Sequence, residues 1–188
     1  GQLFRFARAL NIILETLYYT LHILLPYLWA LYVEGALSTD MKAARRRIGI
    51  ATTLLVLFIL ALAVNVRYGF VFTVDAKNVY HREWGVYVYV SLSCAYLLYA
   101  SIRSLLKAKG AAWADDRRRY YTMAFFAVLP SAGGVLQLLF YGLSLNWILA
   151  SVSILLVYID SQNRQISTDP LTGLNNRRGF LVLSAQFM

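Results

Sequence analysis

Long apolar runs divide this sequence of 188 residues into five segments, each long enough to cross a lipid bilayer. They cover about residues 10–33, 48–66, 86–102, 120–141 and 143–160. The last two come from one stretch of 40 residues, Tyr120 to Ile159, that contains no Asp, Glu, Lys, Arg or His. As a single helix this stretch would be about 60 Å long, twice the roughly 30 Å hydrocarbon core, so we divide it near Tyr141 to Asn146.

Helices are the structure that these segments predict, because a chain inside hydrocarbon must satisfy its own backbone hydrogen bonds. The alternation typical of barrel strands is not sustained anywhere along them. We therefore expect an all-α fold, an integral membrane bundle of five transmembrane helices that fills residues 1–160.

One loop departs from the helical pattern. Residues 70–75 have the composition of a strand, residues 76–78 favour a turn, and residues 79–82 can pair back, which predicts a short β-hairpin. Two interpretations stay open: a lid over a site in the bundle, or an ordered loop with Trp84 anchored at the membrane interface.

Composition supports a membrane environment. Hydrophobic residues make up 60% of the chain and charged residues 14%, against roughly 45–50% and about 25% in an ordinary soluble domain. The net charge of +9 does not favour nucleic acid as a partner, because the basic residues sit in short loops beside the apolar segments. There they set orientation and meet anionic lipid head groups.

The basic residues also predict the orientation. Thirteen of the 18 fall on one side: the loop after the first span, the loop after the third, and the tail. The positive-inside rule places this side, and the C-terminus, in the cytoplasm. Arg5 and Arg8 fit poorly with an outside start, so we expect one more span upstream in the natural chain.

Polar residues inside the spans are the candidates for a binding site, since they are costly in hydrocarbon and usually face the bundle interior. Steps of three and four place Asn11, Glu15, Tyr19, His22 and Pro26 on one stripe of the first helix. With the orientation above, the polar side chains gather in the outer half of the bundle. The predicted ligand-binding residues are Glu15, Tyr19, His22, Asn65, Gln137, Tyr141 and Asn146.

These residues predict a pocket for a small molecule, with Glu15 and His22 as anchors and tyrosines as walls. The alternative is that the same groups only form hydrogen bonds from helix to helix. A metal site is not expected, because His22 and His81 are the only histidines and Cys94 is the only cysteine.

The tail changes character after the last span. Residues 161–168 are polar and suited to a helix, so they predict a stalk that continues the last span. Asp169 followed by Pro170 ends this helix, because proline disfavours helical backbone in the residue before it. A turn and a further helix from Asn176 to Met188 are expected to follow.

The tail resembles the junction between a signalling helix and a GGDEF domain, the catalytic domain of bacterial diguanylate cyclases. Residues 169–180 read DPLTGLNNRRGF and match the D-x-L-T-G-L-x-N-R-R start of that family. The matching positions are Asp169, Leu171, Thr172, Gly173, Leu174, Asn176, Arg177 and Arg178. The stretches NVYHR (78–82) and QLLFYGLS (137–144) are similar to the multi-span sensor regions of such cyclases.

This resemblance implies a membrane sensor in the bacterial inner membrane that controls a cyclase. In that family two GGDEF domains meet in a homodimer, each holding GTP and Mg²⁺, and join two GTP into cyclic di-GMP. Residues 169–188 cover only the start of such a domain, and the Gly-Gly-Asp/Glu-Glu-Phe signature does not occur in the sequence. We therefore expect no cofactor and no catalysis in this fragment itself.

At the junction, the resemblance gives Asp169, Thr172, Arg177 and Arg178 a role in signal coupling, through charge-assisted hydrogen bonds between the stalk and the catalytic domain. The alternative is a solvated charge pair that contributes little. Two other functions stay open for the whole chain: a small membrane transporter or channel, and a receptor with a catalytically inactive GGDEF-like tail.

Overall fold

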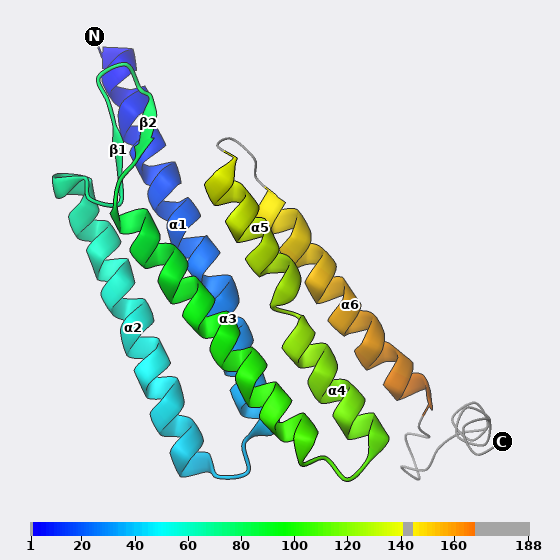
Figure 1. Ribbon diagram of the computed structural model, residues 1–188. Helices are drawn as coiled ribbons and strands as arrows, with labels where there is room; N and C mark the ends of the chain where they lie inside the picture. Colours follow the sequence, from blue (N-terminus) through cyan, green and yellow to red (C-terminus); the bar gives the residue numbers. More distant parts are fainter. Residues whose placement is uncertain (1, 141–144, 168–188) are drawn as a thin grey trace. The chain divides into compact units, whose positions relative to one another are not determined.

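The computed structural model describes residues 2–140 and 145–167. It contains the helices α1 (Gln2–Leu37), α2 (Met41–Tyr68), α3 (Gly85–Lys109), α4 (Ala114–Phe125), α5 (Val128–Leu139) and α6 (Leu145–Ser167). The strands β1 (Phe72–Val74) and β2 (Tyr80–Arg82) join α2 to α3 (Figure 1). The all-α class is confirmed. The described residues contain one small β-hairpin besides the helices.

Four of the helices are long and apolar enough to cross a membrane. The four apolar segments are Arg5–Leu37, Met41–Tyr68, Gly85–Lys109 and Leu145–Gln162. The first three contain the predicted spans 10–33, 48–66 and 86–102, and the fourth covers the described part of the predicted span 143–160. The remaining one, predicted for residues 120–141, falls on α4 and α5, which are separate helices of 12 residues each.

Pro130 explains why that segment is divided. A proline lacks the N–H that would bond to the carbonyl four residues earlier, here that of Phe126, and its ring clashes with that carbonyl. Helix α4 ends accordingly, with the N–H of Phe126 donating to the Thr122 carbonyl (3.2 Å). Helix α5 begins at Val128, so Pro130 lies in the first turn, where its missing N–H costs nothing.

The chain forms two compact units that divide after Lys107. In the first, α1 and α2 pack along each other, β1 lies against α1, and hydrogen bonds described below join α1 to α3. The buried face of α1 continues the polar stripe predicted from the sequence: Tyr19, His22, Pro26, Ala30 and Glu34 are buried at steps of three and four.

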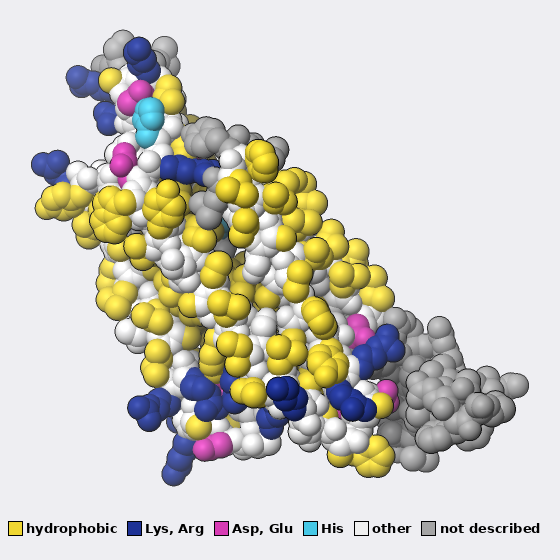
Figure 2. Space-filling model, viewed as in Figure 1, with side chains coloured by type: hydrophobic (Ala, Val, Ile, Leu, Met, Phe, Trp, Pro, Cys, Tyr) yellow, Lys and Arg dark blue, Asp and Glu magenta, His cyan; other side chains and the backbone are white. Residues whose placement is uncertain are grey.

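The opposite faces of these helices are apolar and exposed. On α1 they include Leu14, Leu17, Leu21 and Leu28, each more than half exposed, and Figure 2 shows hydrophobic side chains over much of the helical surface. An apolar surface of this extent is what a lipid-facing helix presents, whereas proteins dissolved in water rarely expose large continuous apolar patches.

The ends of α2 are fixed by local chemistry. At its start the Asp40 carboxylate accepts hydrogen bonds from the N–H groups of Lys42 (2.9 Å) and Ala43 (3.2 Å), an N-cap. At its end Gly69 adopts φ 64°, the left-handed conformation that favours glycine. The chain then turns directly into the hairpin.

The hairpin itself is confirmed as predicted. Its register pairs Phe72 with Arg82, Thr73 with His81 and Val74 with Tyr80. The turn is closed by the Asp75 carboxylate, which accepts from the N–H groups of Lys77 and Val79, both at 2.8 Å.

In the second unit, α5 and α6 pack closely and α4 also contacts α6. Gly133 makes this approach possible: a Cβ at this position would lie 3.0 Å from the Cα of Asn146 and 3.1 Å from Cδ1 of Leu149. A Cβ on Gly134 would meet nothing within 4 Å. Of the two adjacent glycines, Gly133 is therefore the one that helix packing requires.

Candidate functional site

The polar stripe of α1 meets the hairpin in a group of aromatic side chains that we call the hairpin cluster. The Tyr19 and Tyr80 hydroxyls are hydrogen-bonded at 2.5 Å, and His22 Nδ1 lies 3.0 Å from the Tyr89 hydroxyl. The Tyr19 ring stacks on Phe72 and meets Tyr89 edge-on, with centroids 5.7 Å and 5.2 Å apart. Side chains from α1, β1, β2 and α3 thus form one group, in which Tyr19, His22 and Phe72 are buried and Tyr80 and Tyr89 are half-buried.

Two further bonds fasten the hairpin to the first part of α1. The Arg8 Nε donates to the Val74 carbonyl (2.9 Å), and the Asn11 amide donates to Asn78 Oδ1 (3.2 Å). Asn78 has φ 63°, a conformation that asparagine tolerates better than most residues. The hairpin is therefore bonded to α1 through both its strand and its turn.

Asn65, predicted as a ligand residue, is bonded to the hairpin's backbone. It is 1% exposed, its Oδ1 accepts from the N–H of Val71 (2.6 Å), and its Nδ2 donates to the Phe72 carbonyl (3.1 Å). Buried polar groups are usually satisfied in this way. Asn65 therefore fixes the backbone at the start of β1 by hydrogen bonds to Val71 and Phe72.

The electrostatics of the hairpin are set by two groups outside the apolar helices. Burial raises the pKa of the Tyr80 hydroxyl above its ordinary value, which keeps it protonated as a partner for Tyr19. The backbone N–H of Val79, together with His81 and the N–H of Lys77, holds the pKa of the Asp75 carboxyl below its usual range. Asp75 therefore acts as an ionised acceptor in the turn.

The other predicted ligand residues have different surroundings. Glu15 is half-buried on the α1 stripe and interacts electrostatically with Arg82 of β2. Gln137 and Asn146 belong to α5 and α6 of the second unit. Tyr141 lies outside the described residues. The structure thus brings Tyr19 and His22 together with Asn65 near the hairpin, and Glu15 joins them through Arg82.

Sequence reasoning missed a second buried group, which we call the Glu34 cluster, at the opposite end of the first unit. Glu34 of α1 is 1% exposed. Its carboxylate pairs with Arg47 of α2 (2.6 Å) and Arg103 of α3 (3.3 Å). The hydroxyls of Ser38 and Tyr99 also donate to it. One carboxylate therefore links three helices.

A signal for this cluster was present in the sequence. Glu34 lies eight residues after Pro26, two steps of four along the predicted stripe, but one residue beyond the predicted span of residues 10–33. Arg47 and Arg103 are among the 13 basic residues from which the orientation is predicted. Charge-assisted bonds of this kind are strong, and breaking a buried pair costs more than the pair contributes. The Glu34 cluster can therefore fix how α1, α2 and α3 are rotated against one another.

Within residues 2–140 and 145–167 there is no group of three or more His, Cys, Asp or Glu side chains that would hold a metal ion. The predicted coupling residues Asp169, Thr172, Arg177 and Arg178 lie outside the described residues.

Comparisons with models of protein families, with curated proteins and with solved structures find no match to this chain.

Proposed function

We propose that this chain is the sensory membrane part of a diguanylate cyclase of the bacterial inner membrane. It would take its input from a small molecule at the helical bundle and pass it to a cytoplasmic GGDEF domain. The observation that carries the proposal is the D-x-L-T-G-L-x-N-R-R match at residues 169–178, placed directly after a helix that leaves the apolar region without a break.

Helix α6 supplies the physical link. It is apolar over Leu145–Gln162 and continues as one helix to Ser167, two residues before Asp169. A continuous helix transmits a rotation or a shift along its axis, whereas a flexible linker would absorb either. Its close packing on α5 at Gly133 supports the same idea, because a displacement of one helix would be shared by the other.

The hairpin cluster is the input region of this proposal. It joins α1, the hairpin and α3 through the Tyr19–Tyr80 and His22–Tyr89 bonds. A ligand that favours one arrangement of these elements would shift the balance between two states of the bundle. Homodimerisation through the catalytic domains would then convert a change in α6 into a change in cyclase rate, with GTP and Mg²⁺ bound only to those domains.

A first experiment tests the output. The sequence that follows Met188 in the natural protein is determined, and membranes containing the full-length protein are supplied with GTP and Mg²⁺. An intact Gly-Gly-Asp/Glu-Glu-Phe signature and formation of cyclic di-GMP are expected. A degenerate signature without product would support the inactive receptor, and ion or solute flux in sealed vesicles would support the transporter.

A second experiment tests the coupling. Two residues inserted after Gln162 turn the following part of α6 by about 200°, while seven inserted residues nearly restore its face. We expect the two-residue insertion to change cyclic di-GMP formation severalfold and the seven-residue insertion to leave it nearer the parent value. Equal effects of both insertions would contradict coupling through the orientation of α6.

A further inference from the structure

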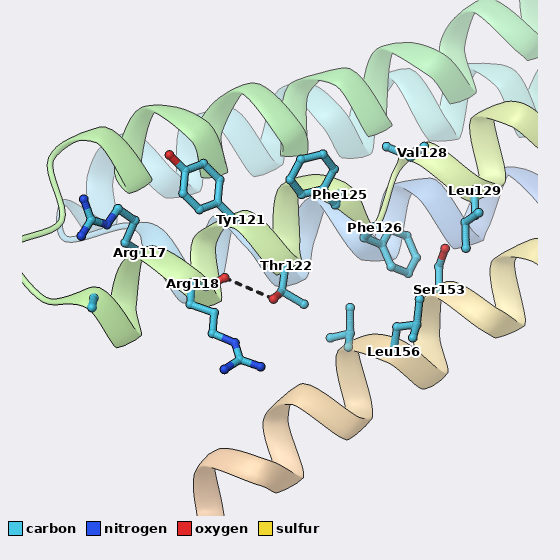
Figure 3. A pocket seen from close by; sticks show the side chains of 12 residues that line it. Arg117, Arg118, Tyr121, Thr122, Phe125, Phe126, Val128, Leu129, Ser153 and Leu156 are labelled. Carbon is cyan, nitrogen blue, oxygen red and sulfur yellow. Dashed lines mark hydrogen bonds between the residues drawn. The ribbon is translucent and has the colours of Figure 1, made fainter. Parts of the chain in front are cut away.

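A pocket of about 650 Å³ lies in the second unit, between α4, the start of α5 and α6 (Figure 3). Its size is within the roughly 300–1,000 Å³ usual for small-molecule sites. It lies beside the interruption between α4 and α5, and Phe126, the residue at the break, forms part of its wall.

The walls are mainly apolar. Phe125 and Phe126 from the end of α4, Leu129 from α5 and Leu156 from α6 line the pocket, and Figure 3 shows Phe126, Leu129 and Leu156 around the same space. Thr122 adds no free donor, because its hydroxyl donates to the Arg118 carbonyl (3.1 Å). The interior therefore suits a hydrocarbon chain or ring.

One end of the pocket is basic. Arg117 and Arg118 of α4 both line it. Arg118 Nε is 3.5 Å from Asp160 Oδ1, so part of its charge is compensated. The Arg117 side chain makes no hydrogen bond or ion pair with any residue in the described part of the chain. A positive charge is left at this end for an anionic group.

A polar atom also lies deep in the apolar part. Ser153 of α6 lines the pocket and is 2% exposed, and its Oγ has no hydrogen-bond partner among the described residues. A buried polar group without a partner is unfavourable, so such a group in a pocket marks where a ligand's polar atom fits. Ser153 and Asp160 are seven residues apart on α6, so this hydroxyl lies about 10 Å from the basic end.

We propose that this pocket binds a single-chain amphiphile with an anionic head group and an oxygen atom on its chain about 10 Å from that head. The head lies at Arg117 and Arg118, the chain runs along Phe126 and Leu156, and the distal oxygen meets Ser153. A carboxylate and a phosphate head share the required charge. Binding itself does not depend on the cyclase, but any effect of this second site, apart from the hairpin cluster, on cyclic di-GMP formation rests on the proposed function.

The test uses the full-length protein in nanodiscs of zwitterionic phosphatidylcholine, with binding measured by calorimetry. The probes are 10-hydroxydecanoate, decanoate, the methyl ester of 10-hydroxydecanoate, and decyl phosphate. We expect 10-hydroxydecanoate to bind roughly three- to tenfold more tightly than decanoate and about tenfold more tightly than the neutral ester. The comparison of decanoate with decyl phosphate identifies the preferred head group.

Variants assign the two polar contacts. Arg117→Gln should remove most of the preference for the acid over the ester, while Arg119→Gln, next to it but outside the pocket, should change affinity less than about twofold. Ser153→Ala should abolish the preference for the hydroxylated chain. Ser151→Ala is the matched control, because this exposed serine on the same helix donates to the Trp147 carbonyl (2.8 Å).

A covalent readout covers the case in which a variant binds too weakly for calorimetry. In a background in which every native cysteine, Cys94 included, is replaced by alanine, Leu129→Cys at the half-buried wall of the pocket should be alkylated by a membrane-permeant maleimide, and 10-hydroxydecanoate should slow this reaction severalfold. The proposal is overturned if acid and ester bind equally and the thiol is not protected, since the pocket would then hold only bulk lipid. Because none of these measurements involves cyclic di-GMP, their failure is distinct from failure of the proposed cyclase.

Discussion

At the scale of single residues, the same stripe of α1 does two different tasks. Near the hairpin it presents Tyr19 and His22, which form hydrogen bonds with the Tyr80 and Tyr89 hydroxyls. At the other end it presents Glu34, which accepts from two arginines and two hydroxyls. A buried carboxylate is tolerated only with such partners, so the Glu34 cluster should be sensitive to substitution.

Replacing the carboxylate tests this directly. Glu34→Gln leaves Arg47 and Arg103 without their counter-charge, and we expect the free energy of unfolding to fall by about 1–3 kcal/mol, since both arginines are partly exposed. Unfolding in detergent, followed by loss of helical circular dichroism, measures the change. Arg46→Gln, an exposed residue of α2, should stay within about 0.5 kcal/mol. Equal effects of the two would contradict the role of the cluster.

The hairpin turn should respond to acid through Asp75. Because the folded turn depresses this carboxyl's pKa, its stabilisation is complete above the ordinary value of about 3.9 and is lost as the pH falls through the lower folded value. We expect faster hydrogen exchange at the amides of Lys77 and Val79, beyond the intrinsic pH effect, below about pH 4. Asp75→Asn should remove this pH dependence. If it persists, another group controls the turn.

At the scale of elements, helix breaks and close approaches are set by small and cyclic residues. Pro130 divides one apolar segment into α4 and α5, and Gly133 lets α5 approach α6. The neighbouring Gly134 faces open space. The sequence alone does not distinguish the two positions, because both are glycines in the same apolar segment. The helix break thus falls at the proline, and the close helix packing falls at only one of the two glycines.

These adjacent glycines provide a matched pair of substitutions. In Gly133→Ala the new methyl group meets the Asn146 backbone at 3.0 Å, so α5 and α6 must separate, and we expect a loss of about 1–3 kcal/mol. Gly134→Ala should be neutral or stabilising by about 0.5–1 kcal/mol, because alanine favours helix. Thermal unfolding of both variants in one detergent gives the comparison. A larger loss at Gly134 would contradict the packing described for α5 and α6.

At the scale of the whole molecule, the chain consists of a hairpin-bearing unit and a second unit that ends in α6. Four helices of the described residues are long and apolar enough to cross a membrane, and the first turns of α2 carry a basic run that includes Arg45 and Arg46. From the positive-inside rule we expect this end of α2 to lie in the cytoplasm and the hairpin to lie outside. The orientation therefore determines whether an external ligand would meet the hairpin cluster or the opposite end of the first unit, where the Glu34 cluster lies.

Labelling of single cysteines tests that orientation. In a background in which every native cysteine, Cys94 included, is replaced by alanine, Lys77→Cys in the hairpin and Lys42→Cys at the start of α2 are compared in intact cells. We expect a membrane-impermeant maleimide to label Cys at position 77 and to leave position 42 unlabelled until the membrane is permeabilised. The reverse pattern would invert the topology and remove the hairpin cluster as an external input.

Much of the fold follows from the sequence because it depends on local chemistry. The apolar lengths of α1, α2, α3 and α6, the cap at Asp40 and the turn at Asp75 each depend on neighbouring residues only. Less of the candidate site can be predicted from the sequence. Tyr19 and His22 were found because a helical stripe is a local repeat, but the bonds of Asn65 to the backbone after α2 require the folded turn.

By itself, the sequence determined the apolar helices, the hairpin between α2 and α3, and the motif at residues 169–178. Hydropathy, turn preference and motif spacing are properties of short segments. Only the tertiary structure decided that Glu34 joins Arg47 and Arg103, and that Ser153 lies in a pocket beside Phe126. Those partners are 13 to 69 residues apart, and their meeting depends on how each helix is rotated about its axis, which packing fixes and local sequence does not.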